Sequence, residues 1–209
     1  MLVLSFHLLV LLLLGIWQSQ PANNSMFMFA HRLQGGQVTQ IWVDYDKIAK
    51  STKQAAIVSE DAKFSQHNGF DFDSIERAIQ KNQQQGTSVG GSTISQQLAK
   101  NLFLTAHRSY LRKAQEAIIT AMMEKMWSKQ RILEVYLNVV EFGEGIYGIE
   151  AAAKHYYGKS AGNLSREESA LLIGMLPNPK YYQKNRHAKR LRNKQKIILQ
   201  RMPSAVLPK

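Results

Sequence analysis

The chain opens with a run of apolar residues. Residues 2–17 are apolar apart from Ser5 and His7. Such a run is slightly shorter than the roughly 20 residues that a helix needs to cross the hydrocarbon core of a bilayer. A cleaved signal peptide is the alternative, but the best cut, after Ala22, leaves a glutamine where signal peptides carry a small residue. We therefore predict an uncleaved transmembrane anchor over residues 1–22.

Beyond this run, hydrophobic positions recur at helical spacing. Residues 18–40 are rich in Gln, Asn and Gly and indicate a linker, with one apolar cluster at 26–29 that is expected to pack under the domain. The pattern then predicts helices at about 52–61, 72–80, 93–104, 109–127, 129–140, 149–157 and 165–176, followed by an amphipathic helix in the tail. A polar, glycine-containing loop is expected at 83–91. Since strand signals are almost absent, the expected fold class is mainly α.

Residues with known preferences for helix ends support these boundaries. Ser165 and Glu168 have the spacing of a capping box, and Gly158 suits a helix C-terminus. Ser92 is expected to cap the helix that begins at Thr93. The pattern as a whole divides the chain into an anchor (1–22), a linker and membrane-proximal segment (23–45), a helical domain (46–185) and a basic C-terminal helix and tail (186–209).

Charge is distributed unevenly. The 209 residues carry a formal net charge of +12 and no cysteine, so disulfide and thiolate chemistry are excluded. No Asp or Glu occurs after Glu168, whereas ten Lys and Arg residues lie between Lys180 and Lys209. A basic face of this kind binds anionic lipid, pyrophosphate or nucleic acid through the same Coulomb attraction. A solvated helix end explains the pattern equally well.

Carboxylates are the best candidates for chemistry. The six histidines have no metal-binding spacing, and the glycines at 86–91 lack the lysine of a phosphate-binding loop. Glu60 is predicted at the C-terminal end of a helix, where negative partial charge strengthens a carboxylate as a base for a hydroxyl proton. On pattern alone, a glutamate at such a position is more often structural.

A second set of polar residues lies at helical spacing. Ser92, Gln96 and Lys100 are four residues apart, as are Arg112 and Glu116. Clustered cations and amides on one helix face would stabilise an anionic pyrophosphate leaving group. Ordinary surface pairs, which contribute little, are the alternative.

At these residues the sequence resembles the glycosyltransferase domain of peptidoglycan synthases, glycosyltransferase family fifty-one, and within it the monofunctional biosynthetic peptidoglycan transglycosylases. The resemblance covers about residues 54–182. It rests on ordered motifs: SEDAKFSQHNGFD from 59, GGSTISQQLAKNLFL from 90, RSYLRKAQEA from 108, SKQRILEVYLN from 128, EFGEGIYGIEAAAKHYYGK from 141 and ALLIGMLPNP from 170. It implies a lysozyme-like helical domain with a smaller, mobile membrane-side lobe that includes the 83–91 loop.

The resemblance also implies roles for individual residues. Glu60 resembles the general base that takes the proton from the 4-hydroxyl of the acceptor GlcNAc, so that undecaprenyl pyrophosphate leaves the donor with inversion. Glu116 resembles the second carboxylate, which supports the donor pyrophosphate directly or through Mg or Mn. No cofactor is required. Lys100 and Arg108 resemble the cations that neutralise the leaving phosphates. The lining or orienting positions are Gln96, Gln97, Ser92 and Asp61.

The expected partners follow from this reaction. They are lipid II, the growing lipid-linked glycan chain and membrane lipid, together with other cell-wall synthases or division proteins; a nucleic-acid partner is not expected. The expected location is the bacterial inner membrane, single-pass, with the catalytic domain on the periplasmic side. Family members usually carry a longer basic segment before the anchor, so this topology is inferred from the substrate. No transpeptidase motif follows, so another protein is expected to cross-link the strands.

Two other functions compete with this interpretation. A lysozyme-like hydrolase shares the pair of carboxylates but uses water as the attacking group. The cations Lys100 and Arg108 favour a pyrophosphate leaving group instead. A non-catalytic scaffold is the second alternative, and the presence of both Glu60 and Glu116 argues against it.

Overall fold

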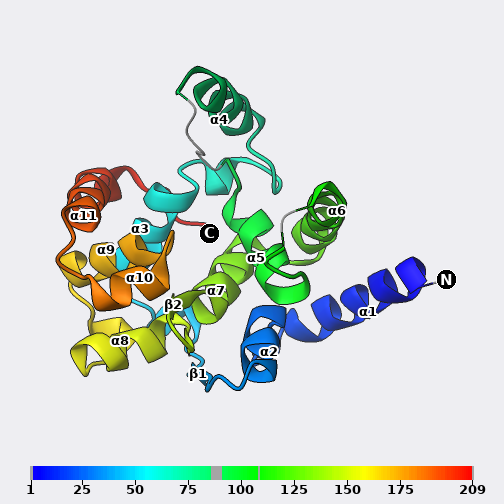
Figure 1. Ribbon diagram of the computed structural model, residues 1–209, viewed down its shortest axis with the longest axis horizontal. Helices are drawn as coiled ribbons and strands as arrows, with labels where there is room; N and C mark the ends of the chain where they lie inside the picture. The colour runs from blue at the N-terminus through cyan, green and yellow to red at the C-terminus, as the bar shows by residue number, and fades with distance from the viewer. Residues whose placement is uncertain (1, 86–90, 108, 209) are drawn as a thin grey trace.

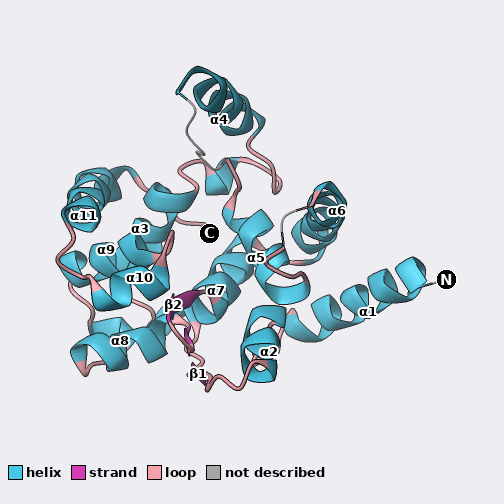
Figure 2. Cartoon of the chain, viewed as in Figure 1, coloured by secondary structure: helices cyan, strands magenta, loops and turns pink. Residues whose placement is uncertain are grey.

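The protein is mainly helical, as the sequence pattern predicts (Figures 1 and 2). The structure, a computed structural model, describes residues 2–85, 91–107 and 109–208. The helices are α1 (Leu2–Trp17), α2 (Met26–Leu33), α3 (Lys50–Glu60), α4 (Phe72–Gln85), α5 (Ile94–Phe103), α6 (Tyr110–Met126), α7 (Lys129–Val139), α8 (Ile149–Tyr157), α9 (Arg166–Met175), α10 (Pro179–Lys184) and α11 (Lys189–Arg201). This composition is consistent with the lysozyme-like domain that the resemblance implies.

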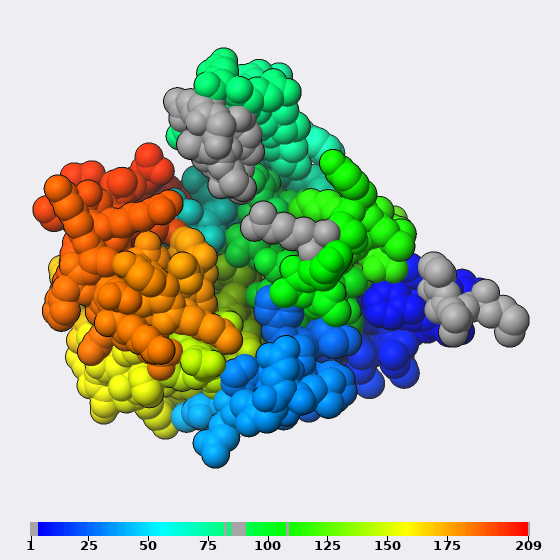
Figure 3. Space-filling model, in the orientation of Figure 1, coloured from blue at the N-terminus to red at the C-terminus, as the bar shows by residue number. Residues whose placement is uncertain are grey.

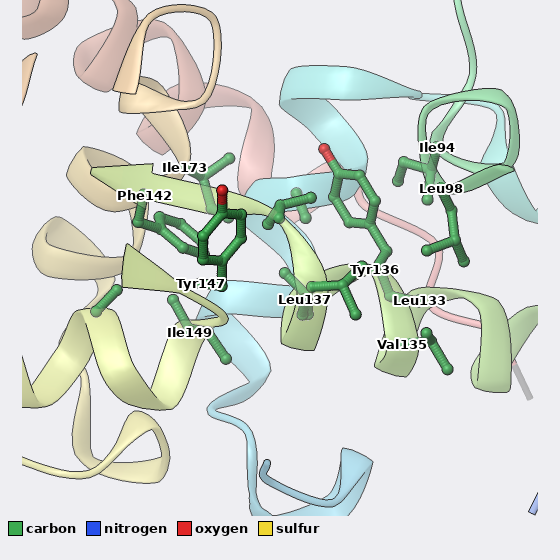
Figure 4. Close-up of a cluster of buried hydrophobic side chains, with 14 of the residues drawn as sticks. Ile94, Leu98, Leu133, Val135, Tyr136, Leu137, Phe142, Tyr147, Ile149 and Ile173 are labelled. Carbon is green, nitrogen blue, oxygen red and sulfur yellow. The ribbon is translucent and has the colours of Figure 1, made fainter. Parts of the chain in front are cut away.

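The helices form two flanks joined by a shared core. Helices α3, α9 and α11 pack together on one side, and α5 packs against α6 and α7 on the other. Apolar side chains from both groups meet in one buried cluster, part of which is shown in Figure 4 around Tyr136 of α7. The amphipathic faces of the helices therefore specify the core, and the polar ends of α3 and α5 are left near the junction of the flanks.

A small sheet, which the sequence did not indicate, ties the N-terminal segment to the domain. Strands β1 (Thr39–Gln40), β2 (Glu141–Gly143) and β3 (Ile146–Tyr147) form it in the order β1-β3-β2, with β1 parallel and β2 antiparallel to β3. Next to it, the side chain of Asn138 accepts a hydrogen bond from Val43 N and donates one to Val43 O, both at 2.8 Å. Strands β1 and β3 are about 100 residues apart in the sequence, and strands of two or three residues are too short to show a strand pattern, so the sequence did not predict their pairing.

The segment interpreted as a linker contains a packed helix. Ser25 caps α2, accepting from Met28 N at 3.2 Å, and Met28 is fully buried. The prediction that the apolar cluster at 26–29 packs under the domain is confirmed for Phe27 and Met28, whereas Phe29 is 52% exposed. The sequence did not predict α2, because a helix of eight residues has too few apolar positions to show a helical period.

Helix α1 corrects the prediction of a transmembrane anchor. No helix among residues 2–85, 91–107 and 109–208 is long and apolar enough to cross a membrane. The 16 residues of α1 rise by about 24 Å, which falls short of the roughly 30 Å hydrocarbon core. Part of its apolar surface is used internally, because Val10 and Leu14 are buried and Trp127 Nε1 donates to Leu14 O at 2.8 Å. The predictions of a transmembrane helix and of a single-pass inner-membrane location are therefore wrong.

Most helix ends lie within a few residues of the predicted ones. The Ser165–Glu168 capping box forms, and Gly158 takes the left-handed conformation at the end of α8. Two details differ. Thr93, rather than Ser92, caps α5, and α4 continues to Gln85, so that the first residues of the expected 83–91 loop are helical. Residues 86–90 of that loop lie outside the described residues.

Candidate functional site

Glu60 is the last residue of α3, and three side chains hold its carboxylate. Ser59 donates to Oε1 at 2.7 Å, and the Lys194 ammonium of α11 lies 3.2 Å from the same oxygen. Gln97 Nε2 of α5 donates to Oε2 at 3.3 Å. The Glu60 side chain is 13% exposed. A partly buried carboxylate is therefore fixed between two helices that follow it in the sequence by 37 and 134 residues.

Asp61 turns away from Glu60 and anchors α5. Its Oδ2 accepts from Ile94 N, the first residue of α5, at 3.0 Å, and His67 Nε2 lies 2.9 Å from its Oδ1. A carboxylate at a helix N-terminus satisfies a free N–H and interacts favourably with the helix dipole. Asp61 lines the cleft, but its contacts indicate that it positions α5 relative to α3.

The first turn of α5 presents Gln97 to Glu60. Thr93 and Gln96 form a capping box, in which the Gln96 side chain accepts from Thr93 N at 3.0 Å. Tyr136 then donates to Gln97 Oε1 at 3.1 Å, which orients the amide so that its NH₂ faces Glu60. Burial raises the pKa of the Tyr136 phenol well above its ordinary value, and the carboxylates of Glu60 and Asp61 raise it further. Tyr136 therefore remains a hydrogen-bond donor at any working pH.

Glu60 and Asp61 open onto a cleft of about 280 Å³ between α3, α4 and α5, which we call the Glu60 cleft. Its wall also includes Ser92 and Arg201. In the space-filling view the molecule is hollowed between the orange and red C-terminal segments and the green segments that contain α5 and α6 (Figure 3). A Cβ on Gly91, which lies in the cleft wall, would come within 3.1 Å of Ile75 Cα in α4, so a larger residue there would require the two segments to move apart by a few tenths of an ångström.

Glu116 is buried in α6 and is paired with two cations of its own helix; we call this group the α6 wall, because Lys113 lines a smaller hollow next to the Glu60 cleft. Arg112 Nη1 donates to Oε2 at 2.7 Å, and the Lys113 ammonium contacts Oε1. The prediction that Arg112 lies beside Glu116 is thus confirmed. Lys113 also donates to Ser92 Oγ at 3.1 Å, which connects the Glu116 group to the Glu60 cleft. One guanidinium and one ammonium around a single carboxylate leave this wall with net positive charge.

The residues around Glu116 do not fit a divalent metal. Within residues 2–85, 91–107 and 109–208, no group of three or more His, Asp or Glu side chains is arranged to hold one. Both Glu116 oxygens are already paired with cations, which would repel a metal ion. The expectation of Mg or Mn at Glu116 stays a prediction that this arrangement does not favour.

The remaining predicted residues occupy different places. Gln96 lines a smaller hollow next to the Glu60 cleft, together with Ser92 and Lys113. The Lys100 ammonium, further along α5, lies 5.8 Å from the centre of the Phe27 ring of α2. Arg108 lies outside the described residues.

Two lysines at the site were missed by reasoning from the sequence. Lys113 is three residues before Glu116, so helical spacing contains a signal for this contact as it does for Arg112. Lys194 was counted only as part of a basic tail, and nothing local links it to Glu60. A contact over 134 residues is decided by how α11 packs on α3 and α9.

Comparison with known proteins identifies the family. The family model described as Transglycosylase matches residues 28–203. The chain belongs to the transglycosylase family. It is 58% identical over 173 residues to the biosynthetic peptidoglycan transglycosylase of Dechloromonas aromatica. The aligned region covers 82% of this chain and 75% of that protein. The proteins of the same name from Acinetobacter baumannii and Acinetobacter baylyi are 50% and 48% identical, covering 92% and 99% of this chain and 87% and 93% of their own lengths.

This membership confirms the resemblance stated from the motifs. The matched region contains Glu60, Glu116 and the residues that hold them, so the site described above belongs to the transglycosylase domain. The prediction of an enzyme of the glycosyltransferase class is confirmed.

Proposed function

We propose that this transglycosylase polymerises lipid II into peptidoglycan strands for the cell wall, with Glu60 as the general base. The family and the names of the relatives support peptidoglycan synthesis as the process. The observation that carries the mechanism is a fixed carboxylate, Glu60, in the same cleft as Ser92, which accepts a hydrogen bond from Lys113 of the positively charged group on α6.

The base step assigns a role to each oxygen of Glu60. Oε1 already accepts hydrogen bonds from Ser59 and Lys194, whereas Oε2 accepts one, from Gln97, among the described residues. A carboxylate oxygen has two lone pairs. Oε2 is therefore the oxygen that takes the proton from the 4-hydroxyl of the acceptor GlcNAc, as positioned bases do in general base catalysis.

The bond changes then balance without a further reactant. The acceptor oxygen forms a bond to C1 of the donor MurNAc, and the bond from C1 to the pyrophosphate oxygen breaks. The proton resides on Glu60, and the electron pair leaves with undecaprenyl pyrophosphate. Because the hydroxyl attacks from the face opposite the leaving group, the configuration at C1 inverts.

The α6 wall supplies the charge that the leaving group requires. Lys113 and Arg112 are held by Glu116, and no described residue accepts a hydrogen bond from the buried Arg112 Nε. Cations fixed before the reaction stabilise developing negative charge without reorganising. Lys100 and Arg108 extend this set in our proposal, as the family resemblance implies.

The test is incubation of the full chain with labelled lipid II, with products resolved by size, beside Glu60→Gln and the exposed control Glu144→Gln. We expect long lysozyme-sensitive glycan from the wild type and from the control, and none from Glu60→Gln. Near-normal polymerisation by Glu60→Gln would reject Glu60 as the base. Shortening of preformed strands without polymer would indicate a hydrolase instead.

A further inference from the structure

Helix α11 presents three cations on one face. Arg190, Lys194 and Arg201 are separated by four and seven residues, which places them along one side of a helix. Arg201 lines the Glu60 cleft, and Lys194 contacts Glu60. Lys194 and Arg190 also line a second hollow, next to α10. The basic face of α11 therefore runs from the Glu60 cleft, past the catalytic carboxylate, to this second hollow.

The second hollow, which we call the α10–α11 hollow, has the size and lining of a ligand site. Its volume is about 600 Å³, within the range of small-molecule sites. Asn178 and Tyr181 form the side opposite α11. The Tyr181 ring is 49% exposed and packs edge-on against buried Tyr182, with ring centres 5.2 Å apart. A supported aromatic ring offers a flat apolar surface beside polar groups.

The charge of the α10–α11 hollow selects an anionic ligand. No Asp or Glu occurs after Glu168, so α10 and α11 are without acidic residues. Lys194 is already paired with Glu60, whereas no acidic side chain of the described residues pairs with Arg190. A guanidinium binds a carboxylate through two parallel hydrogen bonds, which makes arginine the suitable side chain for recognising that group.

The geometry of the reaction decides which substrate reaches this hollow. In an inverting transfer, the attacking hydroxyl and the leaving group lie on opposite faces of the donor C1. The cations of the α6 wall mark the side of the leaving pyrophosphate, and Glu60 with α11 marks the side of the attacking hydroxyl. The acceptor therefore extends from Glu60 along α11. Its second sugar, MurNAc, carries a short peptide that bears carboxylates.

We propose that the α10–α11 hollow binds the peptide-bearing MurNAc of the acceptor. Arg190 pairs with a peptide carboxylate, and Tyr181 packs against the peptide or the adjoining sugar. The inference rests on the proposed function, which identifies the substrate. An anionic lipid surface is the competing partner for a basic face, but this face leads to the reacting carboxylate, which favours a substrate.

The first experiment measures a single coupling between a preformed lipid-linked tetrasaccharide as donor and labelled lipid II as acceptor. The second acceptor is the same lipid-linked disaccharide without its peptide. Arg190→Gln should raise KM for the peptide-bearing acceptor about tenfold, the effect of losing one charged hydrogen bond, and leave kcat within about twofold. It should not change KM for the peptide-free acceptor. Lys196→Gln removes an exposed charge from the same helix away from the hollow and is the matched control.

Three results would overturn the proposal. They are an equal rise in KM for both acceptors, no difference between Arg190→Gln and Lys196→Gln, and weaker binding to anionic vesicles with KM unchanged. Equilibrium binding of the peptide-bearing disaccharide without its lipid tests the hollow apart from catalysis, and Arg190→Gln should weaken it about tenfold. If the wild type binds this ligand through Arg190 but makes no glycan, the proposed function is wrong, whereas the proposed ligand of the α10–α11 hollow is supported.

Discussion

Two glutamates, Glu60 at the cleft and Glu116 within α6, are held in different ways. Glu60 ends α3, and its contacts come from the neighbouring Ser59 and from the distant Gln97 and Lys194. Glu116 lies within α6 with only 3% of its side chain exposed, and its cations come from the preceding turn of the same helix. The contacts of Glu60 are brought together mainly by tertiary packing, whereas those of Glu116 follow from the spacing of residues along one helix.

In the proposed mechanism, this difference distinguishes a reacting carboxylate, Glu60, from a supporting one, Glu116. Glu60 retains lone-pair capacity on Oε2 and faces the cleft, so it is able to accept a proton. Both oxygens of Glu116 are paired with cations, so in the proposed mechanism it holds Arg112 and Lys113 in place and the group keeps a net positive charge. Five substitutions test this contrast and the helix caps that support the fold, from the largest expected effect to the smallest.

Glu60→Gln should lower kcat by about 10²–10⁴-fold, since it removes the proton acceptor of general base catalysis. The amide keeps the size of the side chain, and its one oxygen accepts from Gln97 or from Lys194, so the free energy of unfolding should fall by no more than about 1 kcal/mol, the contribution of one hydrogen bond. Steady-state kinetics and urea unfolding measure the two quantities. A variant that loses stability and activity together would make Glu60 a structural residue like Glu116.

Glu116→Gln should mainly reduce stability. It leaves Arg112 and Lys113 without a counter-charge beside a buried position, which costs about 3 kcal/mol when a buried pair is broken. Because Lys113 is 45% exposed on its side chain, water relieves part of that cost, and about 2 kcal/mol is a reasonable expectation. Urea unfolding beside Glu144→Gln gives the value. Unchanged stability would show that the α6 wall does not depend on this glutamate.

Lys113→Gln should weaken donor use, because it removes a cation next to Ser92 while Arg112 still neutralises Glu116. Loss of one charged hydrogen bond to the pyrophosphate should raise the donor KM about tenfold. Lys125→Gln, on an exposed position of the same helix, is the control. Equal losses for donor and acceptor would argue against a leaving-group role.

Glu168→Gln, far along the chain from either wall, should affect stability alone. The backbone hydrogen bond from Ser165, and then Lys159, hold the pKa of Glu168 below its ordinary 4.5. A lowered pKa in the folded state stabilises the protein above pH 4.5, and that contribution is lost as the pH falls further. The variant should therefore lose about 1 kcal/mol near neutral pH, as for a missing cap, and the difference should shrink below pH 4.5.

The matched comparison for Glu168 is Gln96→Ala, which removes the side chain that completes the capping box of α5. Its loss of stability should be similar, but activity should fall as well, because α5 carries Gln97 to Glu60. Equal retention of activity in both variants would show that the capping box of α5 does not support the site.

Much of the fold was predictable because it is local. The helices at α3 and α5 to α9 were expected within a few residues, as were the Ser165–Glu168 box and the Arg112–Glu116 pair. These features depend on a helical period and on hydrogen bonds within four residues. The error at α1 concerns its surroundings and not its helical state: the apolar run predicted a helix, but it did not show that Val10 and Leu14 are buried against the domain.

The sequence by itself determined most of the helices, the Ser165–Glu168 capping box and the residue types at the site, because these depend on short-range spacing. The tertiary structure alone decided that Lys194 reaches Glu60, that Tyr136 orients Gln97 and that Lys113 joins Ser92. Each of these contacts brings together side chains from different helices. Their separation and direction are set by the packing of whole helix faces, and no local pattern in the chain records that packing.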